Sequence, residues 1–430
     1  MAGNNLITTL KRLRGNARGC VLTEPLWGIP FNLYSPFVSV YMLALGVTDS
    51  GIGLIVSVST VFQVFWTLMS GALTDKFGRK RTTLIFDLIS WSVPCLIWAV
   101  AQNFTYFLVA GIVNAVWRVT ANSWNCLLVE DTDPKLLIDI YSWIYIAGLL
   151  SAFVAPLTGP LIARFGLVAT MRGLFVLAFV MMTAKFIVMN AMVTETEQGI
   201  RRMEETAHQG LFDVLRESPA VLRQILKTPV TLYTGALMLI MGVTFTIRGT
   251  FWSVLVAEEL RIPAEHLALY PFARSVTMML FFFFGMPYLL RVVHLTALGE
   301  SALMIVGFIG FVASQTILVV VPVGSYGWLL VATILEGVSV PLTSTMLDKL
   351  TVVTVDAKER ARTMAWLHVG VLVVSSPFGL LAGQLSTLNR RYPFVLVIGL
   401  FIVGGFVTYA AGRAAQRRDA AASAAVSVEV

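Results

Sequence analysis

Long apolar runs, separated by short polar or basic segments, recur along the whole chain. A bilayer core of roughly 30 Å requires about 20 mostly apolar residues per helix. The pattern therefore predicts an all-α polytopic membrane protein with twelve transmembrane helices. We expect these helices at about 20–45, 51–73, 82–101, 104–128, 137–162, 168–193, 229–256, 266–290, 298–321, 326–347, 363–387 and 392–412.

One long polar segment divides the predicted helices six and six, and it is expected to form a surface helix. A faint repeat relates the two groups, because Asp133 precedes Trp143 by the same spacing as Asp356 precedes Trp366. Repeated halves are typical of folds that bind a solute near the bilayer midplane. The predicted organisation is an N-terminal six-helix bundle over 1–193, a cytoplasmic linker over 194–228, a C-terminal bundle over 229–413 and a cytoplasmic tail over 414–430.

The distribution of charge supports this topology. Only 13% of the residues are charged, against about 25% in an average soluble protein. Lysine and arginine gather in the termini and alternate loops, 22 on that side against 5 on the other. The positive-inside rule therefore predicts a multi-pass inner-membrane protein with both termini in the cytoplasm. The net charge of +7 is explained by these loops, and nothing in the sequence indicates nucleic-acid binding.

The loop after the second predicted helix carries glycine, acidic and basic residues at fixed spacing. It reads G-A-L-T-D-K-F-G-R-K and contains Gly71, Asp75, Gly78, Arg79 and Lys80. Every defining position matches G-x-L-x-D-[RK]-x-G-R-[RK], the signature of the major facilitator superfamily, at its usual place between helices 2 and 3. The chain resembles this family of secondary transporters, whose fold consists of two six-helix pseudo-repeat bundles.

The resemblance implies a gating role for the motif. In the family, the aspartate matching Asp75 contacts the opposite half near the start of helix 11, and the arginine matching Arg79 supports that contact. Two other family motifs are missing. A second signature would place an acidic residue at Leu289 and a glycine at Val292, and the helix 4 arginine of proton-coupled members falls at Ala110. These departures weigh against proton antiport.

Helix 4 carries four polar residues, Asn114, Arg118, Asn122 and Asn125, spaced by four, four and three. At helical periodicity they fall within roughly 80° of one another and predict one polar stripe. Polar groups inside a membrane are costly and usually functional, and helix 4 lines the central cavity in the family. The stripe is predicted to recognise substrate through guanidinium and amide donors. The alternative is a hydrogen-bond network between helices that never touches substrate.

Other polar residues within predicted helices complete the candidate cavity. They are Glu24, Trp27 and Asn32 in helix 1, Arg248 in helix 7 and Glu336 in helix 10. Glu24 could pair with Arg118, bind a cation or shuttle a proton. Alternatively, it is an interfacial carboxylate near Arg18.

Three further charged residues are expected to be structural. Asp87 in helix 3 and Lys185 in helix 6 are predicted to pair within the N-terminal half. For Arg274 in helix 8 we expect either snorkelling or pairing with Glu258 or Glu259.

The favoured function is secondary transport of a small polar or anionic solute, sugar-like or carboxylate-like, by alternating access. Drug efflux is the alternative within the family, and a transport-dead membrane sensor or scaffold is the alternative of another class. No metal-ligand spacing or enzyme active site is recognisable, and no nucleotide-binding loop is present. We expect no cofactor, a monomer in the lipid bilayer, and a proton or sodium ion as a candidate coupling ion.

Overall fold

The computed structural model describes residues 13–133, 136–208, 229–293, 300–354 and 360–428, and every regular element in these ranges is a helix. Eleven helical segments there are long and apolar enough to cross a bilayer. The first predicted segment is divided into α2 (Gly15–Tyr34), a 3₁₀ turn (Ser35–Phe37) and α3 (Val38–Ala44). With this divided segment, the predicted fold of twelve transmembrane helices is confirmed.

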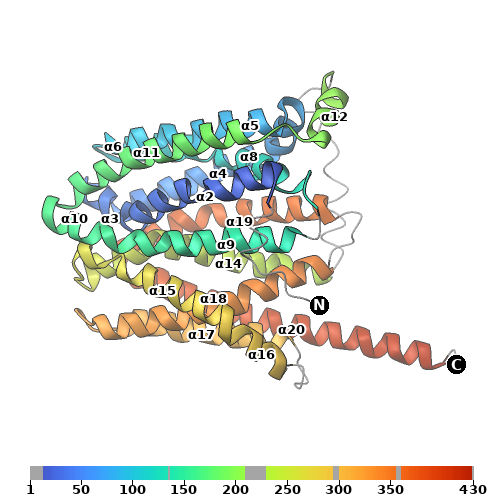
Figure 1. The fold of residues 1–430 in the computed structure, drawn as a ribbon. Coiled ribbons are helices and arrows are strands. Elements are labelled where there is room, and N and C mark those ends of the chain that lie inside the picture. The colour runs from blue at the N-terminus through green and yellow to red at the C-terminus, as the bar shows by residue number, and fades with distance from the viewer. Residues whose placement is uncertain (1–12, 134–135, 209–228, 294–299, 355–359, 429–430) are drawn as a thin grey trace.

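Figure 1 shows the two halves as adjacent groups of roughly parallel helices. The N-terminal half continues with α4 (Asp49–Phe77), α5 (Arg79–Asp87), α6 (Val93–Ala99), α7 (Phe104–Asn114), α8 (Trp117–Val129), α9 (Leu137–Ser151), α10 (Thr158–Phe165) and α11 (Leu167–Met192), followed by the short α12 (Glu197–Thr206). The C-terminal half contains α14 (Pro229–Val254), α15 (Leu269–Leu280), α16 (Met286–Val293), α17 (Glu300–Val320), α18 (Tyr326–Thr354), α19 (Arg360–Leu388) and α20 (Tyr392–Val428).

Local sequence explains where several helices begin and end. Pro36 lies in the 3₁₀ turn between α2 and α3, where its missing N–H interrupts the helical ladder. Thr48 caps α4 by accepting a hydrogen bond from the Gly51 amide at 3.1 Å. Gly78 separates α4 from α5 with a φ of 81°, a conformation that favours glycine.

The described helices 10 and 12 are longer than predicted. α18 continues to Thr354 and α20 to Val428, whereas the apolar runs end near 347 and 412. The sequence after 412 is rich in alanine, the strongest helix former, so α20 does not need a membrane to continue. Figure 1 shows α20 projecting beyond the bundle.

The start of α2 and the end of α20 lie at the same end of the bundle (Figure 1), and we call the opposite end the distal end. There, α4 of the N-terminal half packs against α19 of the C-terminal half. Asp49 accepts hydrogen bonds from Ser386 at 2.9 Å and from Arg390 at 3.1 Å. The Leu380 amide donates to Ser57 at 2.7 Å. These contacts hold the halves together at the distal end.

Glycines allow the close approach of α4 and α19. A Cβ atom built on Gly53 would lie 2.9 Å from the Gly383 Cα atom, so a larger side chain cannot fit without separating the helices. Gly53→Val should therefore open the distal end at a cost of about 1–3 kcal/mol, typical of overpacking. The measurement is the yield of a disulfide between Asp49→Cys and Ser386→Cys, which should fall severalfold in the glycine variant.

Gly173→Val is the matched control, because a Cβ atom on Gly173 meets nothing within 4 Å. It should leave the disulfide yield unchanged. If Gly53→Val gives the same disulfide yield as Gly173→Val, the contact between α4 and α19 does not hold the distal end closed.

Candidate functional site

Several hollows lie between the halves, and two of them share Phe245 of α14 as a lining residue. The smaller, about 300 Å³, is here named the Glu336 lobe and is lined by Phe31, Asn32, Ser35, Pro36, Phe245, Arg248, Gly249, Trp252, Ser253, Tyr270, Pro271, Arg274, Thr333 and Glu336. The larger, about 530 Å³, is named the Arg118 lobe and is lined by Ile55, Val56, Ser59, Thr60, Gln63, Arg118, Met238, Gly242, Phe245, Thr246, Leu347, His368, Val371, Leu372 and Ser375. Together they form the central cavity.

The Glu336 lobe is built around one carboxylate held between two guanidinium groups. Glu336 on α18 forms ion pairs with Arg248 on α14 and, at 2.9 Å, with Arg274 on α15. Glu336 and Arg248 are almost fully buried, with side-chain exposures of 5% and 10%. The Nε atoms of both arginines are buried and have no hydrogen-bond partner among the described groups. One carboxylate balances the charge of only one arginine. The lobe therefore has a net positive charge, and the two Nε–H groups remain available as hydrogen-bond donors.

The Arg118 lobe holds a third guanidinium group. Arg118 on α8 donates from Nε to the Gln63 side-chain oxygen on α4 at 2.9 Å, and it stacks over Trp117 with its Cζ atom 4.1 Å from the ring centroid. Gln63 is neutral, so it orients Arg118 without cancelling its charge. The two lobes therefore share a positive electrostatic character.

The four polar residues that were predicted to form one stripe on helix 4 do not face a common site. The helix is interrupted between α7 and α8, and Asn114 donates to the Ser90 carbonyl of the third crossing helix at 2.7 Å. Asn122 donates to Thr74 of α4 at 3.2 Å, and Asn125 accepts from Tyr141 of α9 at 2.7 Å. Only Arg118 of the four is among the side chains that line the two lobes. For the three asparagines, the contacts match the alternative of a network between helices.

The predicted residues of helix 1 are divided between the cavity and the interior of the N-terminal half. Asn32 lines the Glu336 lobe, although its amide nitrogen donates to the Gly28 carbonyl at 2.8 Å. Trp27 stacks on Phe31, with ring centroids 4.7 Å apart. Glu24 forms an ion pair with Lys185 at 3.0 Å. Glu24 and Trp27 are not among the residues lining either lobe.

Two expected pairings are corrected by the structure. Helix 6 packs against both helix 1 and helix 3, but the carboxylate within ion-pair distance of Lys185 is that of Glu24, at 3.0 Å, and not that of Asp87. Arg274 reaches Glu336 inside the cavity, so it neither snorkels nor meets the distal glutamates. Those glutamates face other arginines, Glu258 toward Arg390 and Glu259 toward Arg391.

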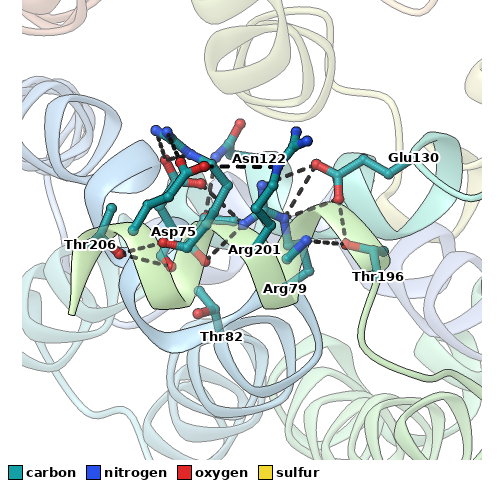
Figure 2. A network of polar contacts seen from close by, with 12 residues as sticks. Asp75, Arg79, Thr82, Asn122, Glu130, Thr196, Arg201 and Thr206 are labelled. Atoms are coloured by element: carbon teal, nitrogen blue, oxygen red, sulfur yellow. Dashed lines mark hydrogen bonds and ion pairs between the residues drawn. The ribbon is translucent and has the colours of Figure 1, made fainter.

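The signature residues form a charge network at the end of the bundle opposite the distal end, shown in Figure 2. Arg79 lies between two carboxylates, with Nη1 3.0 Å from Asp75 and Nε 3.0 Å from Glu130. A second nitrogen, Nη2, also donates to Glu130 at 3.1 Å, which makes that pair bidentate. The Arg79 side chain is only 3% exposed. The signature arginine is thus a buried link between α4, α5 and the end of helix 4.

The linker helix α12 covers this network. Arg202 of α12 forms an ion pair with Asp75 at 2.8 Å, and this hydrogen bond raises the pKa of Arg202 above its ordinary value. Glu195 accepts hydrogen bonds from the backbone amides of Arg79 and Lys80 at 2.9 and 3.0 Å, which caps the N-terminus of α5. The resemblance predicts that Asp75 contacts the start of helix 11. The side chains at the start of helix 11 lie outside the described residues, so this contact stays a prediction. Gly71 lies on α4 beside open space.

Two residues in these sites were missed by the sequence analysis. Gln63 is a polar residue within the second apolar run, a signal that would have identified it. Glu130 lies at the end of the fourth run, where a carboxylate resembles an ordinary loop residue. Its pairing with Arg79 becomes visible only when the helices are packed.

The sequence model of the Major Facilitator Superfamily matches residues 27–297. The chain is 24% identical over 216 residues to multidrug resistance protein MdtG of Serratia proteamaculans (strain 568), covering 49% of this chain and 50% of MdtG. It is 29% identical over 103 residues to quinolone resistance protein NorA of Staphylococcus aureus (strain MRSA252), covering 24% of this chain and 26% of NorA. These matches span half or less of each relative's length.

Solved structures resemble the whole bundle. The nucleoside transporter NupG superposes with a TM-score of 0.68 at 13% identity, covering 92% of this chain and 98% of NupG. The POT family transporter PepTSo superposes with a TM-score of 0.67 at 16% identity, covering 94% of this chain and 98% of PepTSo. At such identities the likeness is one of fold alone. The match of the sequence model over more than half of the chain, together with this fold and the intact signature, shows that the protein belongs to the major facilitator superfamily.

Proposed function

We propose that this protein is a secondary transporter that moves a small anionic or polar solute by alternating access. The observation that carries the proposal is the sharing of one buried carboxylate, Glu336, between Arg248 and Arg274. With Arg118 in the adjoining lobe, the charged side chains of the cavity sum to a net positive value. A desolvated, net-positive cavity favours an anion, because a cation would add an unpaired charge to a low-dielectric site.

The chemistry of the lining narrows the solute class. Guanidinium groups bind carboxylates and phosphates through paired N–H donors. The unpartnered Nε atoms of Arg248 and Arg274 are donors of this kind. Lobes of about 300 and 530 Å³ suit a small organic molecule. A carboxylate-bearing or hydroxyl-rich solute fits these donors best.

We further propose an inner-membrane location with both termini in the cytoplasm, based on the 22 to 5 distribution of lysine and arginine. In that orientation, the distal contacts of Asp49 close the cavity toward the outside. The two halves, 1–193 and 229–413, would then rock about the cavity, with the signature network as the gate on the cytoplasmic side. A gradient of solute, proton or sodium would supply the energy.

Transport can be tested without knowing the solute. Proteoliposomes containing the purified protein would be incubated with a pool of small carboxylates, phosphorylated compounds, sugars and organic cations, and their contents identified by mass spectrometry. The proposal expects selective accumulation of anionic or hydroxyl-rich compounds, absent from protein-free liposomes. Accumulation of organic cations alone would overturn it, and binding without flux would favour a sensor.

Arg118→Ala should weaken solute binding by roughly tenfold to a hundredfold, the usual range for a lost hydrogen bond to a charged group. Binding would be measured by isothermal titration with the solute found in the flux assay. Arg201→Ala, on the 68% exposed Arg201 of α12, is the matched control and should bind normally. Unchanged affinity in Arg118→Ala would remove the Arg118 lobe from the binding site.

Drug efflux is a second candidate function, favoured by the names of the curated relatives MdtG and NorA. Aromatic side chains in the Glu336 lobe, Phe31, Trp252 and Tyr270, could contact an apolar drug. Expression in a drug-sensitive bacterial strain distinguishes the two functions. Raised resistance to several hydrophobic cations would favour efflux, whereas the anion proposal expects no change.

A further inference from the structure

A buried cluster of three ionisable groups lies inside the N-terminal half, apart from the central cavity. Glu24 of α2 and Lys185 of α11 form an ion pair at 3.0 Å, with side-chain exposures of 15% and 7%. Asp87, the last residue of α5, is 5% exposed and interacts electrostatically with both. The solute site described above uses none of the three.

The charges of this cluster do not balance. Two carboxylates face one ammonium group, so full ionisation would leave one uncompensated negative charge within the membrane-spanning bundle. An unpaired buried charge is costly, and two carboxylates that share a site rarely ionise together. One proton on the cluster removes the imbalance.

The observed ion pair assigns that proton to Asp87. Glu24 already has the ammonium group of Lys185 as its partner, at 3.0 Å. Asp87 is buried, and among the described residues it forms no ion pair of its own. Asp87 is therefore the carboxylate that has to be neutral in this arrangement.

The other groups facing the cluster add no second cation. From α2, Cys20 is the remaining ionisable neighbour. From α8, Trp124 places its ring centroid 5.8 Å from the Lys185 Nζ atom, and Trp27 of α2 lies at 5.9 Å. Both rings favour the ammonium form of Lys185 through their π faces. Among the described residues, Lys185 is therefore the cation for which the two carboxylates compete.

The backbone beside Asp87 departs from a regular α-helix. A π-helical turn, Leu88–Ser92, begins at the next residue, and such turns occur frequently at functional sites. Asn114 supports this turn by donating to the Ser90 carbonyl at 2.7 Å. This gives the predicted helix 4 asparagine a role in shaping the cluster.

We propose that Glu24, Lys185 and Asp87 form a proton-binding site that holds one exchangeable proton. While Lys185 pairs with Glu24, as observed, Asp87 carries the proton. When Lys185 turns to Asp87, the O–H bond on Asp87 breaks and one forms on Glu24, the more exposed carboxylate, which exchanges the proton with water. The site would supply a coupling proton, and it does not depend on the identity of the solute.

Infrared difference spectroscopy of the purified protein at neutral pH tests this assignment through the C=O band of a protonated carboxyl group. Asp87→Asn should remove one such band. Glu24→Gln should also remove it, although Asp87 is still present, because Lys185 is then free to pair with Asp87. Lys185→Met should add a second band, since both carboxylates become neutral. Glu205→Gln, on the exposed helix α12 outside the cluster, is the control, and it should leave the band unchanged.

Three results would overturn the proposal. The first is a spectrum unchanged by Asp87→Asn. The second is a band that persists in Glu24→Gln, which would mean that Asp87 is protonated independently of Lys185. The third is the absence of a new band in Lys185→Met. If Asp87→Asn does not fold, the other two variants still decide the question.

Discussion

Glu336→Ala is expected to destabilise the protein by about 3–5 kcal/mol, the usual cost of removing one partner of a buried ion pair. The reason is that Glu336 is the carboxylate that both Arg248 and Arg274 contact. Its removal leaves two positive charges facing each other across a desolvated lobe. Thermal unfolding in detergent would show the loss as a markedly lower midpoint.

Two further variants make this test specific. Glu205→Ala removes the same type of side chain from exposed pairs on α12 and should cost less than about 1 kcal/mol. Replacing the whole cluster, with Glu336→Leu, Arg248→Met and Arg274→Met together, should recover most of the stability, because apolar residues of similar size carry no desolvation penalty. If Glu336→Ala is no less stable than Glu205→Ala, the cluster is not a buried charge centre.

Arg79→Ala is expected to cost a similar 3–5 kcal/mol, because it leaves Glu130 and Asp75 facing each other without the buried cation between them. Arg79→Lys should recover only part of this loss, since an ammonium group cannot reproduce the bidentate contact with Glu130. The measurement is again thermal unfolding, here combined with limited proteolysis of the α12 region, which should become more susceptible.

Arg202→Ala is the matched control for this variant. Arg202 also pairs with Asp75, but its side chain is 41% exposed, so its loss should cost less than about 1 kcal/mol. If Arg79→Ala and Arg202→Ala destabilise the protein equally, the buried position of Arg79 does not give its ion pairs a larger effect on stability.

Most of the fold could be predicted because the requirement for crossing a bilayer is local. Each apolar run is by itself long enough to cross the bilayer, and the signature identifies which runs are helices 2 and 3. Interruptions were harder to predict. Pro36 marks the break in helix 1, whereas Ala115 and Val116, where helix 4 is interrupted, are not helix breakers. That interruption helps to distribute the expected polar stripe among three neighbouring helices.

The candidate site was predictable only as far as the cost of buried charge identifies single residues. Arg118, Arg248 and Glu336 could each be selected because charge inside a membrane is expensive. Their partners could not be predicted, since pairing depends on how distant helices pack. Thus Glu336 meets two arginines, and Lys185 meets Glu24, through contacts more than 60 residues apart in sequence.

The central claim is that the cavity disfavours a cationic solute and accommodates an anionic one, and the most direct test is thermal unfolding of the wild-type protein with size-matched organic anions and cations. A ligand at 100 times its dissociation constant adds about 2.7 kcal/mol of stability. At least one carboxylate or phosphate should stabilise the wild type, and this gain should fall to about half or less in Arg118→Ala and be retained in Arg201→Ala. Stabilisation by hydrophobic cations alone would contradict it.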